Sequence, residues 1–295
     1  MAAPATSPAI TVPAAPRSRG YWENVARRFV RDPVAIFAGL VVLALLAMAV
    51  FGPWLAPADP FKSSMLGRLQ PIGSEAYPLG SDELGRDMLS RLIVGARLSL
   101  FMGITPVVLA FFIGSAIGIL AGYAGGIVNT SIMRTIDVFY AFPSVLLAIA
   151  LSGALGAGIG NALLSLTIVF IPPIARVAES VTTQVRSRDY VEAARASGAR
   201  AFTIVRVHVL GNVLGPIFVY ATSLIAVSMI LASGLSFLGL GVKPPEPEWG
   251  LMLNTLRTAI YVQPWVAALP GAMIFITSIA FNLLSDSLRS AMDVK

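Results

Sequence analysis

Side chains that commonly carry out catalysis are scarce in this sequence. Its 295 residues include no cysteine and a single histidine, His208, which excludes thiol chemistry and a zinc site made of several histidines. A phosphate-binding loop needs a lysine directly after a glycine, and none of the three lysines, Lys62, Lys243 and Lys295, follows one. We therefore expect no catalytic residue, no metal site and no cofactor in this chain, and we do not expect it to be an enzyme.

The polar segment 176–208 is the strongest candidate for a binding element. Good helix formers follow Asp189, whose negative charge suits a helix start, and Gly198 can end that helix. Such a short helix could fit a groove in a soluble partner, and an ordinary connector between two helices is an equal alternative. Its small and charged residues are Glu192, Ala193, Ala194, Arg195, Ala196 and Ser197.

The residues beyond this helix predict a second one. Phe202, Val205 and Val209 are three and four residues apart and would share one helix face. The segment would then consist of a short helix, a bend at Gly198, and a second helix that leads into an apolar span.

Charged residues of both signs also gather between residues 80 and 91. The spacing of Asp82, Glu83 and Asp87 does not fit a calcium-binding loop. From the residues alone, 80–91 could form a polar surface helix that leads into a span. Further along the chain, three prolines prevent a helix just before Trp249, which would suit the aromatic belt at a membrane interface.

The elements that position these residues are indicated by the charge distribution. Only 12% of the residues are charged and 56% are hydrophobic, whereas a soluble domain is about one quarter charged. A bilayer core takes roughly 20 apolar residues per helix, and several charge-free stretches are longer than that. These stretches are 33–58, 98–133, 138–175, 209–242 and 258–285. The sequence therefore predicts an integral membrane protein.

The number of spans follows from the helix rise. The charge-free stretch 138–175 would form a helix much longer than a bilayer core of about 30 Å. Four glycines within 152–160 indicate a break, so two helices are expected there. The fold class is therefore all-α, with six transmembrane helices. The predicted spans are 34–55, 98–122, 135–152, 160–178, 213–236 and 264–286.

Basic residues set the orientation of these spans. With a cytoplasmic N-terminus, the inner segments hold 14 of the 21 arginines and lysines and the outer segments hold 7, as the positive-inside rule requires. Both termini are therefore predicted to be cytoplasmic. The net charge of +6 is expected to favour anionic membrane lipid, and nucleic acid is not an expected partner.

The N-terminal segment divides into two parts. Residues 1–20 are rich in alanine, proline and serine and are predicted to be disordered. Within 21–31, Trp22, Val25 and Phe29 recur at helical spacing beside arginines, which suits a short helix on the inner membrane surface. A solvated start to the first span is the open alternative.

The predicted short helix resembles the "EAA" loop of ABC importer permeases. The residues that carry the resemblance are Glu192, Ala193, Ala194, Gly198, His208 and Asn212. In that family the loop forms a coupling helix, which sits in a cleft of the cytoplasmic ATPase subunit. Gly211 stands where many relatives have a proline. The residues that the resemblance implies for ATPase coupling are Glu192, Ala193, Ala194, Arg195 and Gly198.

Two external segments resemble, more narrowly, the C-type permeases of dipeptide and oligopeptide importers. One leads into the second span, and the other follows the fifth span. The matching residues of the external motif are Gly80, Asp82, Gly85, Arg86, Asp87, Arg91 and Trp249. Arg134, Asp137 and Pro143 also fit the third-span pattern of that family. Because Arg134 and Asp137 are three residues apart, they are expected to form a local pair at a helix end.

The resemblance covers nearly the whole chain after residue 21 and implies a larger assembly. It implies the type I ABC importer permease fold in a bacterial inner membrane, and a heterodimer with a second permease subunit. Two ATPase domains would bind ATP and magnesium, and an external solute-binding protein would deliver dipeptides or oligopeptides. Nickel chelates, opines and other peptide-like solutes are alternative cargoes. An ion-coupled carrier is a distant alternative, because the central portions of the spans hold no ionisable residue.

These expectations divide the chain into four parts. Residues 1–32 form a cytoplasmic tail with a short interfacial helix, and 33–96 form the first span and an external loop. Residues 97–289 form the transmembrane core, which includes a coupling loop at 186–208, and 290–295 form a second cytoplasmic tail. Four polar residues of the spans could line a pathway, although hydrogen bonding between helices is the favoured role. They are Ser223, Ser228, Ser233 and Asn282.

Overall fold

The computed structural model describes residues 21–292, and their regular structure is helical. The predicted disorder of residues 1–20 and the last residues of the predicted 290–295 tail lie outside this range. Five long apolar helices can cross a membrane by length and composition, and a sixth span is reached if a bent helix pair counts as one. The all-α fold is confirmed, and the predicted six spans agree with this range of five to six. The five are α2 (Pro33–Leu55), α3 (Met88–Ala124), α6 (Ile159–Arg186), α9 (Leu210–Phe237) and α11 (Pro264–Met292).

The third span is not the straight helix predicted at 135–152. It consists of α4 (Gly126–Tyr140) and α5 (Ser144–Leu155), which meet at an angle of 86°. Pro143 lies at the break, and proline both lacks an N–H donor and disfavours helical backbone in the residue before it. The glycine-rich break predicted at 152–160 is confirmed, because α5 ends there with positive φ angles at Gly156 and Gly158.

The expected local pair of Arg134 and Asp137 is also wrong. Asp137 lies in α4 and forms an ion pair with Arg176, which belongs to α6. Helix packing therefore determines the partner of Asp137, since the two residues are 39 positions apart in the chain.

The helices α3 and α6 pack closely against each other along a row of glycines. Gly114, Gly118 and Gly122 recur every four residues along α3 and therefore lie on one face of the helix. A Cβ atom on Gly122 would lie 2.7 Å from the carbonyl oxygen of Glu179 in α6. Small residues let membrane helices approach this closely without a polar side chain between them.

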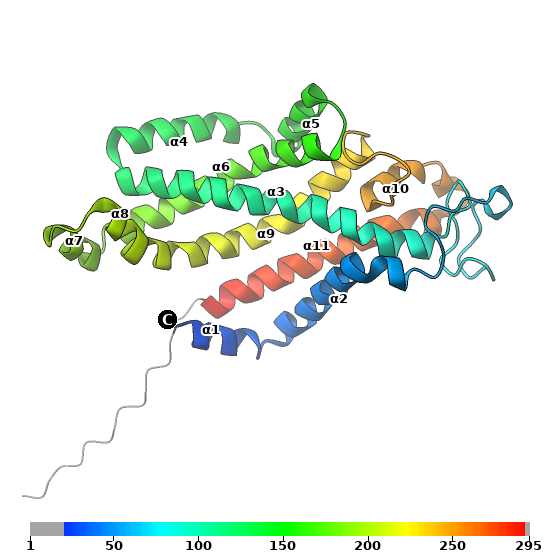
Figure 1. Cartoon of the computed structure of the whole chain (residues 1–295), viewed down its shortest axis with the longest axis horizontal. Helices are drawn as coiled ribbons and strands as arrows, with labels where there is room; N and C mark the ends of the chain where they lie inside the picture. Colours follow the sequence, from blue (N-terminus) through cyan, green and yellow to red (C-terminus); the bar gives the residue numbers. More distant parts are fainter. Residues whose placement is uncertain (1–20, 293–295) are drawn as a thin grey trace, which may run out of the picture.

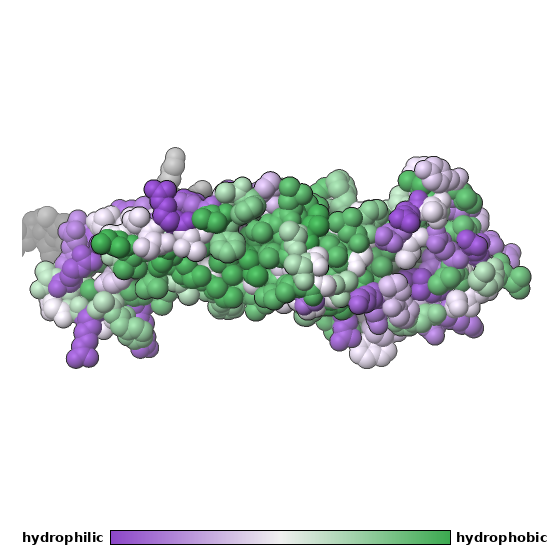
Figure 2. All heavy atoms as spheres, turned by 90° about the horizontal axis from the view of Figure 1, so that it is seen from above, coloured by the Kyte–Doolittle hydropathy of each residue, from purple (hydrophilic) through white to green (hydrophobic). Residues whose placement is uncertain are grey.

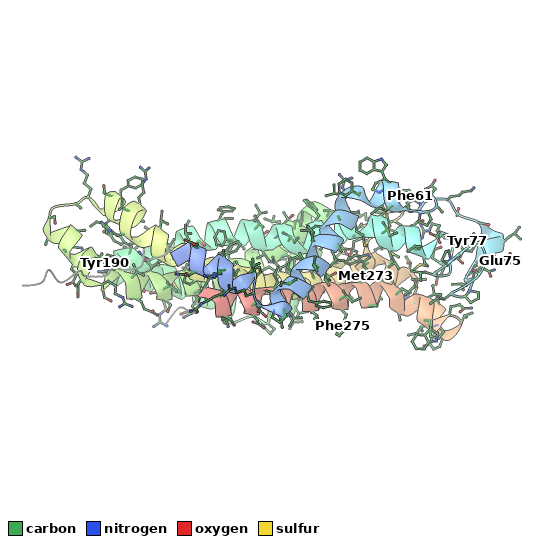
Figure 3. All side chains as sticks on the ribbon, turned by 90° about the horizontal axis from the view of Figure 1, so that it is seen from below. Phe61, Glu75, Tyr77, Tyr190, Met273 and Phe275 are labelled. Atoms are coloured by element: carbon green, nitrogen blue, oxygen red, sulfur yellow. The ribbon has the colours of Figure 1, made fainter. Side chains whose placement is uncertain are left out.

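The chain has two polar ends separated by an apolar middle. Figure 1 shows α7 (Asp189–Ala196), α1 (Tyr21–Phe29) and the end of α11 toward one end, and the α2–α3 loop with α10 (Trp249–Thr255) toward the other. In Figure 2 hydrophobic atoms cover the middle of the face, and hydrophilic atoms gather at the two ends. Figure 3 likewise places Tyr190 at the α7 end and Glu75 at the opposite end.

Short elements complete the helical order. α1 is a helix separate from the first span and packs on α11, with Val25 buried. Asp32 then caps α2 by accepting the backbone N–H of Val34 at 2.9 Å. The predicted division at residues 96 and 97 falls inside α3, so it does not coincide with the end of an element. The remaining short elements are η1 (Met65–Gly67), α8 (Ala201–Ile204), the π-helical turn η2 (Val205–Val209) and η3 (Ala259–Tyr261).

Candidate coupling helix and external cap

One buried side chain fixes α7 against the bundle. Val191 is fully buried in the main hydrophobic core, where Ile204 and Val209 also lie. The ring of Tyr190, whose centroid is 6.2 Å from that of His208, adds a second contact to the segment that follows. The other residues of the predicted coupling set lie at the surface. Glu192, Ala193, Arg195 and Gly198 are exposed and Ala194 is half-buried.

The end of α7 is confirmed as predicted. Gly198 has a φ of +82°, a backbone conformation that glycine adopts without the steric cost of a Cβ atom. Its N–H donates to the carbonyl of Arg195 at 3.0 Å, and the N–H of Ala199 donates to that of Ala194 at 3.1 Å. These bonds close the last turn of α7 and direct the chain into α8.

The second helix differs from the prediction in its register. α8 passes through the π-turn η2 directly into α9, and Val209 is buried whereas Phe202 is 76% exposed. The extra residue of a π-turn rotates the helix face, so Phe202 does not share a buried face with Val209. The helix continues through Gly211, and the Asn212 side-chain amide donates to the carbonyl of His208 at 2.7 Å.

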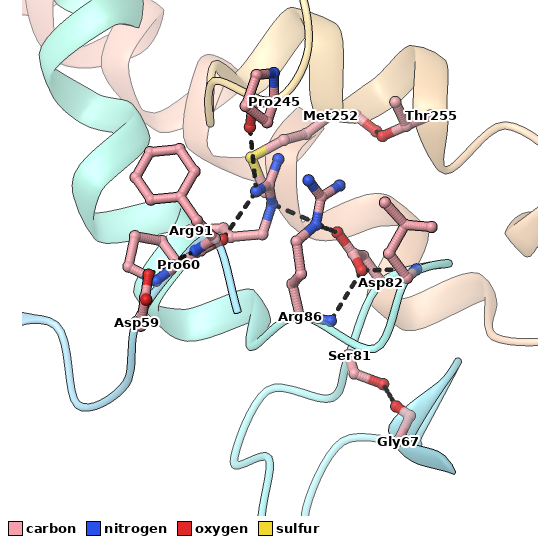
Figure 4. Close-up of polar contacts among 12 residues, drawn as sticks. Asp59, Pro60, Gly67, Ser81, Asp82, Arg86, Arg91, Pro245, Met252 and Thr255 are labelled. Carbon is pink, nitrogen blue, oxygen red and sulfur yellow. Dashed lines mark hydrogen bonds and ion pairs between the residues drawn. The ribbon is translucent and has the colours of Figure 1, made fainter. Parts of the chain in front are cut away.

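Asp82 is the centre of a buried charge cluster at the opposite end of the chain (Figure 4). Its Oδ2 accepts a bond from Nε of Arg86 at 2.6 Å and lies 3.4 Å from Nε of Arg91. Its Oδ1 accepts the backbone N–H groups of Leu84 and Arg86, each at 2.9 Å. Residues 80–87 therefore form a tight loop, and the surface helix considered for 80–91 begins only at Met88.

Arg91 joins three segments that are distant in the sequence. Its guanidinium donates to the carbonyl of Pro60 at 2.9 Å and lies 3.5 Å from that of Pro245. The α2–α3 loop, the start of α3 and the loop before α10 thus meet around one side chain, as Figure 4 shows. We call this arrangement the external cap. Asp87 contributes by capping α3, since its Oδ2 accepts the N–H of Ser90 at 2.8 Å.

Backbone conformation explains why glycine occupies two positions of the external motif. Gly80 and Gly85 have φ angles of +81° and +71°, which other residues adopt only with strain. A Cβ atom on Gly80 would also lie 2.6 Å from the carbonyl oxygen of Gln70. The Asp82 carboxylate is already bound by arginines and backbone N–H groups. Its role is therefore to hold the loops of the external cap together. Within residues 21–292, no group of three histidine, aspartate or glutamate side chains is placed to hold a metal ion.

Trp249 lies inside the external cap, so its prediction as an interface-belt residue is wrong. The side chain is fully buried, and its indole N–H donates to the carbonyl of Leu92 at 3.0 Å. Its backbone N–H donates to Oγ of Ser99 at 3.0 Å. Trp249 therefore fixes α10 against α3.

Glu248, the residue before Trp249, was not predicted from the sequence as a residue of this site. This carboxylate is almost fully buried and caps α10 by accepting the N–H groups of Gly250 and Leu251 at 2.9 and 2.8 Å. Burial raises the pKa of Glu248, and the hydrogen bonds from Gly250 and Leu251 partly oppose that increase. Glutamate is not among the preferred N-cap residues, so the available signal was only a negative charge after helix-breaking prolines, which the helix dipole favours at a helix start.

The polar residues considered for the pathway do not form the expected bonds between helices. Ser223 donates to the carbonyl of Tyr220 within its own helix at 2.7 Å. Ser228 and Ser233 are buried, and the Ser228 hydroxyl has no hydrogen-bond partner. Asn282 is exposed on α11.

The fold is similar to that of ABC transporter chains of known structure. It superposes on a chain of the inward-facing MetNI methionine ABC transporter with a TM-score of 0.57 and 20% identity, covering 69% of this chain and 97% of the other. A chain of an amino acid ABC transporter gives a TM-score of 0.51 at 15% identity, covering 66% and 91%. At these identities the similarity concerns the fold.

Sequence comparison then gives the family. Residues 114–295 match the binding-protein-dependent transport system inner membrane component family, and residues 20–71 match the N-terminal transmembrane domain of oligopeptide transport permease C. The chain belongs to the family of binding-protein-dependent transport system inner membrane components. It is therefore a multi-pass inner membrane permease subunit of an ATP-driven importer, and its family is one of transport permeases.

Relatives of similar length support this assignment. The glutathione transport system permease protein GsiD of Pectobacterium atrosepticum is 43% identical over 274 residues, covering 93% of this chain and 91% of the relative. The di/tripeptide transport system permease protein DppC of Pseudomonas aeruginosa is 39% identical over 298 residues, covering 99% and 96%. The family predicted from the sequence motifs, that of C-type peptide importer permeases, is confirmed.

Proposed function

We propose that this chain forms half of a membrane pathway for short peptides and that α7 couples it to a cytoplasmic ATPase. The observation that carries the coupling role is the combination of a fully buried Val191 with an exposed surface of small and charged residues. Because its buried side chain holds α7 on the bundle, a displacement of α7 by the ATPase can be transmitted to α8 and α9. These helices follow α7 through one short turn. Burial of Val191 holds α7 in a fixed position on the bundle, and its exposed residues remain available to a partner.

The partners follow from the same assignment. The chain would pair with a second, different permease subunit, and two ATPase domains that bind ATP and magnesium would dock on the α7 side. An external solute-binding protein would dock on the external cap, whose loops are fixed by the buried cluster around Asp82 and Trp249. A rigid cap costs less entropy on binding than mobile loops would.

Peptides are the proposed cargo. The relatives named above are a glutathione permease and a di/tripeptide permease, and both are similar to this chain over more than 90% of its length. Both names describe small solutes with peptide bonds and free ionised groups. Nickel chelates and opines are the other cargo classes to compare in transport assays.

The coupling role is tested by reversing one charge on α7. The chain is co-expressed with its neighbouring permease and ATPase chains, and Glu192→Arg is compared with Glu75→Arg, which makes the same change at an exposed position on the external end. We expect Glu192→Arg to abolish co-purification of the ATPase and to reduce ATP-driven peptide uptake at least tenfold. Glu75→Arg is expected to retain ATPase association.

Two outcomes would contradict the proposal. If the ATPase co-purifies equally with both variants and uptake is unchanged, α7 is a connector and the docking surface lies elsewhere. If vesicles take up peptide in the absence of any ATPase, the chain acts as a carrier, and ATP coupling itself is wrong.

A further inference from the structure

The helix α4 is attached to the bundle separately from the long helices. Its buried side chains, Met133 and Ile136, form a small hydrophobic cluster with Ala121 of α3 and Ala175 of α6. In the described part of the chain this cluster is distinct from the main core, which joins α2, α3, α5, α6, α9, α10 and α11. Figure 1 shows α4 at the edge of the bundle, alongside α3 and α6. A helix held by few buried apolar contacts can separate from its neighbours at lower cost than one embedded in the main core.

Both ends of α4 are joints at which regular helix is interrupted. At its start, Gly125 and Gly126 have φ angles of +69° and +52°, and no atom of the described residues lies within 4 Å of the Cβ position of Gly126. At its other end, α4 meets α5 at an angle of 86° beside Pro143. Hinges in proteins are a few residues at element ends that absorb changes in φ and ψ, and glycine has the widest choice of both.

A polar contact joins the first turn of α4 to α6. The side-chain amide of Asn129 donates to Oε1 of Glu179 at 2.7 Å and to the carbonyl of Ala121 at 3.2 Å. The hydroxyl of Thr183, one turn further along α6, donates to the same Oε1 at 3.1 Å. Hydrogen bonds to a carboxylate are stronger than those between neutral groups. We call the contact between Asn129 and Glu179 the first clasp.

An ion pair joins the last turn of α4 to α6. Asp137 of α4 pairs with Arg176 of α6, and we call this contact the second clasp. The guanidinium carbon of Arg176 also lies 5.8 Å from the ring centroid of Tyr140, the last residue of α4. Separation of the pair leaves two charges without a partner, which is favourable only where water reaches them. The second clasp therefore favours two discrete positions of α4, paired with α6 or apart from it with water between them.

A cavity lies at the α4–α5 break, and α4 supplies part of its wall. The cavity has a volume of about 310 Å³. Its lining includes Phe139 and Tyr140 from α4, Phe170 and Pro172 from α6, and Tyr220 from α9. Because these side chains come from different helices, a displacement of α4 away from α6 would widen the cavity, and its return would narrow it.

We propose that α4 is a gate over this cavity, hinged at Gly125–Gly126 and at the bend beside Pro143, and that the two clasps hold it closed. The structure has the closed position, because both clasps are formed. The inference rests on the proposed function, in which the ATPase displaces α7. Only Ser187 and Arg188 separate α7 from α6, the helix that carries one half of each clasp. A displacement of α7 would therefore reach both clasps through α6.

Alkylation of an introduced cysteine tests whether the gate opens. The chain contains no cysteine, so Ala175→Cys places its single thiol at a fully buried position in the cluster shared with α4. Ala121→Cys probes the same cluster from α3, and Ala38→Cys is the control at a fully buried position of α2. The variants are reconstituted with the partner chains and the binding protein and treated with N-ethylmaleimide. With trialanine and ATP, we expect at least tenfold faster labelling at positions 175 and 121 than without ATP, and a change of less than about twofold at position 38.

Removal of a clasp tests what holds the gate. In the Ala175→Cys background, Asn129→Ala is compared with Thr130→Ala, because the Thr130 hydroxyl donates only within α4, to the carbonyl of Gly126 at 3.1 Å. We expect Asn129→Ala to be labelled at least fivefold faster than Thr130→Ala in the absence of ATP. Asp137→Asn with Arg176→Gln removes the charges of the second clasp together and is expected to have the same effect. Co-purification with the second permease shows that each variant is folded.

The possible failures are distinguishable. If trialanine uptake is driven by ATP while labelling at positions 175 and 121 does not depend on ATP, α4 is not a gate and the proposed function stands. If the clasp variants are labelled no faster than Thr130→Ala, the two polar contacts do not hold α4, and the inference is wrong. If the wild-type transporter takes up no peptide under ATP, the proposed function is wrong and this inference falls with it.

Discussion

A Cβ atom placed on Gly118 of α3 would lie only 2.6 Å from the Cβ of Ala178 in α6. The same relationship holds one turn away, where a Cβ on Gly114 would lie 2.9 Å from the carbonyl oxygen of Ile171. These glycines form a continuous seam between two spans that lie far apart in the sequence. Added Cβ atoms at these positions would meet α6 backbone and Cβ atoms, so the seam has no room for a larger residue unless the two helices move apart.

We therefore expect Gly118→Ala to destabilise the bundle by about 1–3 kcal/mol through overpacking. Gly153→Ala is the matched control, because Gly153 lies in α5 with no atom within 4 Å of its Cβ position. The control is expected to change stability by less than about 1 kcal/mol. Thermal unfolding of both variants in detergent provides the measurement. Equal melting temperatures would show that α3 and α6 can separate without cost.

Removal of the Asp82 carboxylate should loosen the external cap. Asp82→Ala would leave Arg86 and Arg91 buried without a counter-charge, and breaking a buried pair in this way costs about 3–5 kcal/mol. Limited proteolysis from the external side is expected to cut the 56–87 loop at least tenfold faster than in the wild type. Glu75→Gln, an exposed site in the same loop, serves as control. A wild-type cleavage rate in Asp82→Ala would mean that other contacts hold the cap.

Glu248 predicts a pH dependence of stability. Burial raises its pKa above the ordinary value of 4.5, so the folded chain binds this proton more tightly than the unfolded chain. The resulting stabilisation is complete below pH 4.5 and is lost as the pH rises through the raised folded-state pKa. Glu248→Gln should remove this part of the pH dependence, which thermal unfolding across a pH series would measure.

The same residue allows a second comparison at neutral pH. Glu248→Ala removes the acceptor for two backbone N–H groups and is expected to cost about 1 kcal/mol more than Glu248→Gln, which keeps one amide oxygen at that place. If the alanine variant is as stable as the glutamine variant, the cap on α10 has no energetic role.

Gly198 links backbone conformation to coupling. Its Cβ position is open, so only its φ of +82° disfavours Gly198→Ala, by about 1–2 kcal/mol. We expect the variant to fold but to couple poorly, with peptide-stimulated ATPase activity reduced severalfold. Gly211→Ala is the control, since Gly211 lies in regular helix with equally open space. Unchanged stimulation in Gly198→Ala would show that the turn after α7 tolerates other conformations.

Local sequence patterns were sufficient to predict the spans, the α7 helix and the family of this protein. Charge-free stretches predicted six spans because burial in a bilayer requires apolar residues along the whole length of a helix. The α7 helix and its end at Gly198 were predictable because capping and positive φ angles depend on a few adjacent residues. The family was predicted from motifs in short segments, namely the α7 region and the two external segments.

Tertiary structure alone decided which residues meet. Arg91 contacts Pro245 across 154 positions, and Asp137 pairs with Arg176 where the sequence spacing favoured Arg134. Trp249 is buried against α3, although its residue type and its position after helix-breaking prolines suited a membrane interface. The physical reason is that hydropathy and helix propensity are properties of neighbouring residues, whereas ion pairs, buried rings and the cavity at the α4–α5 break depend on how separate helices pack.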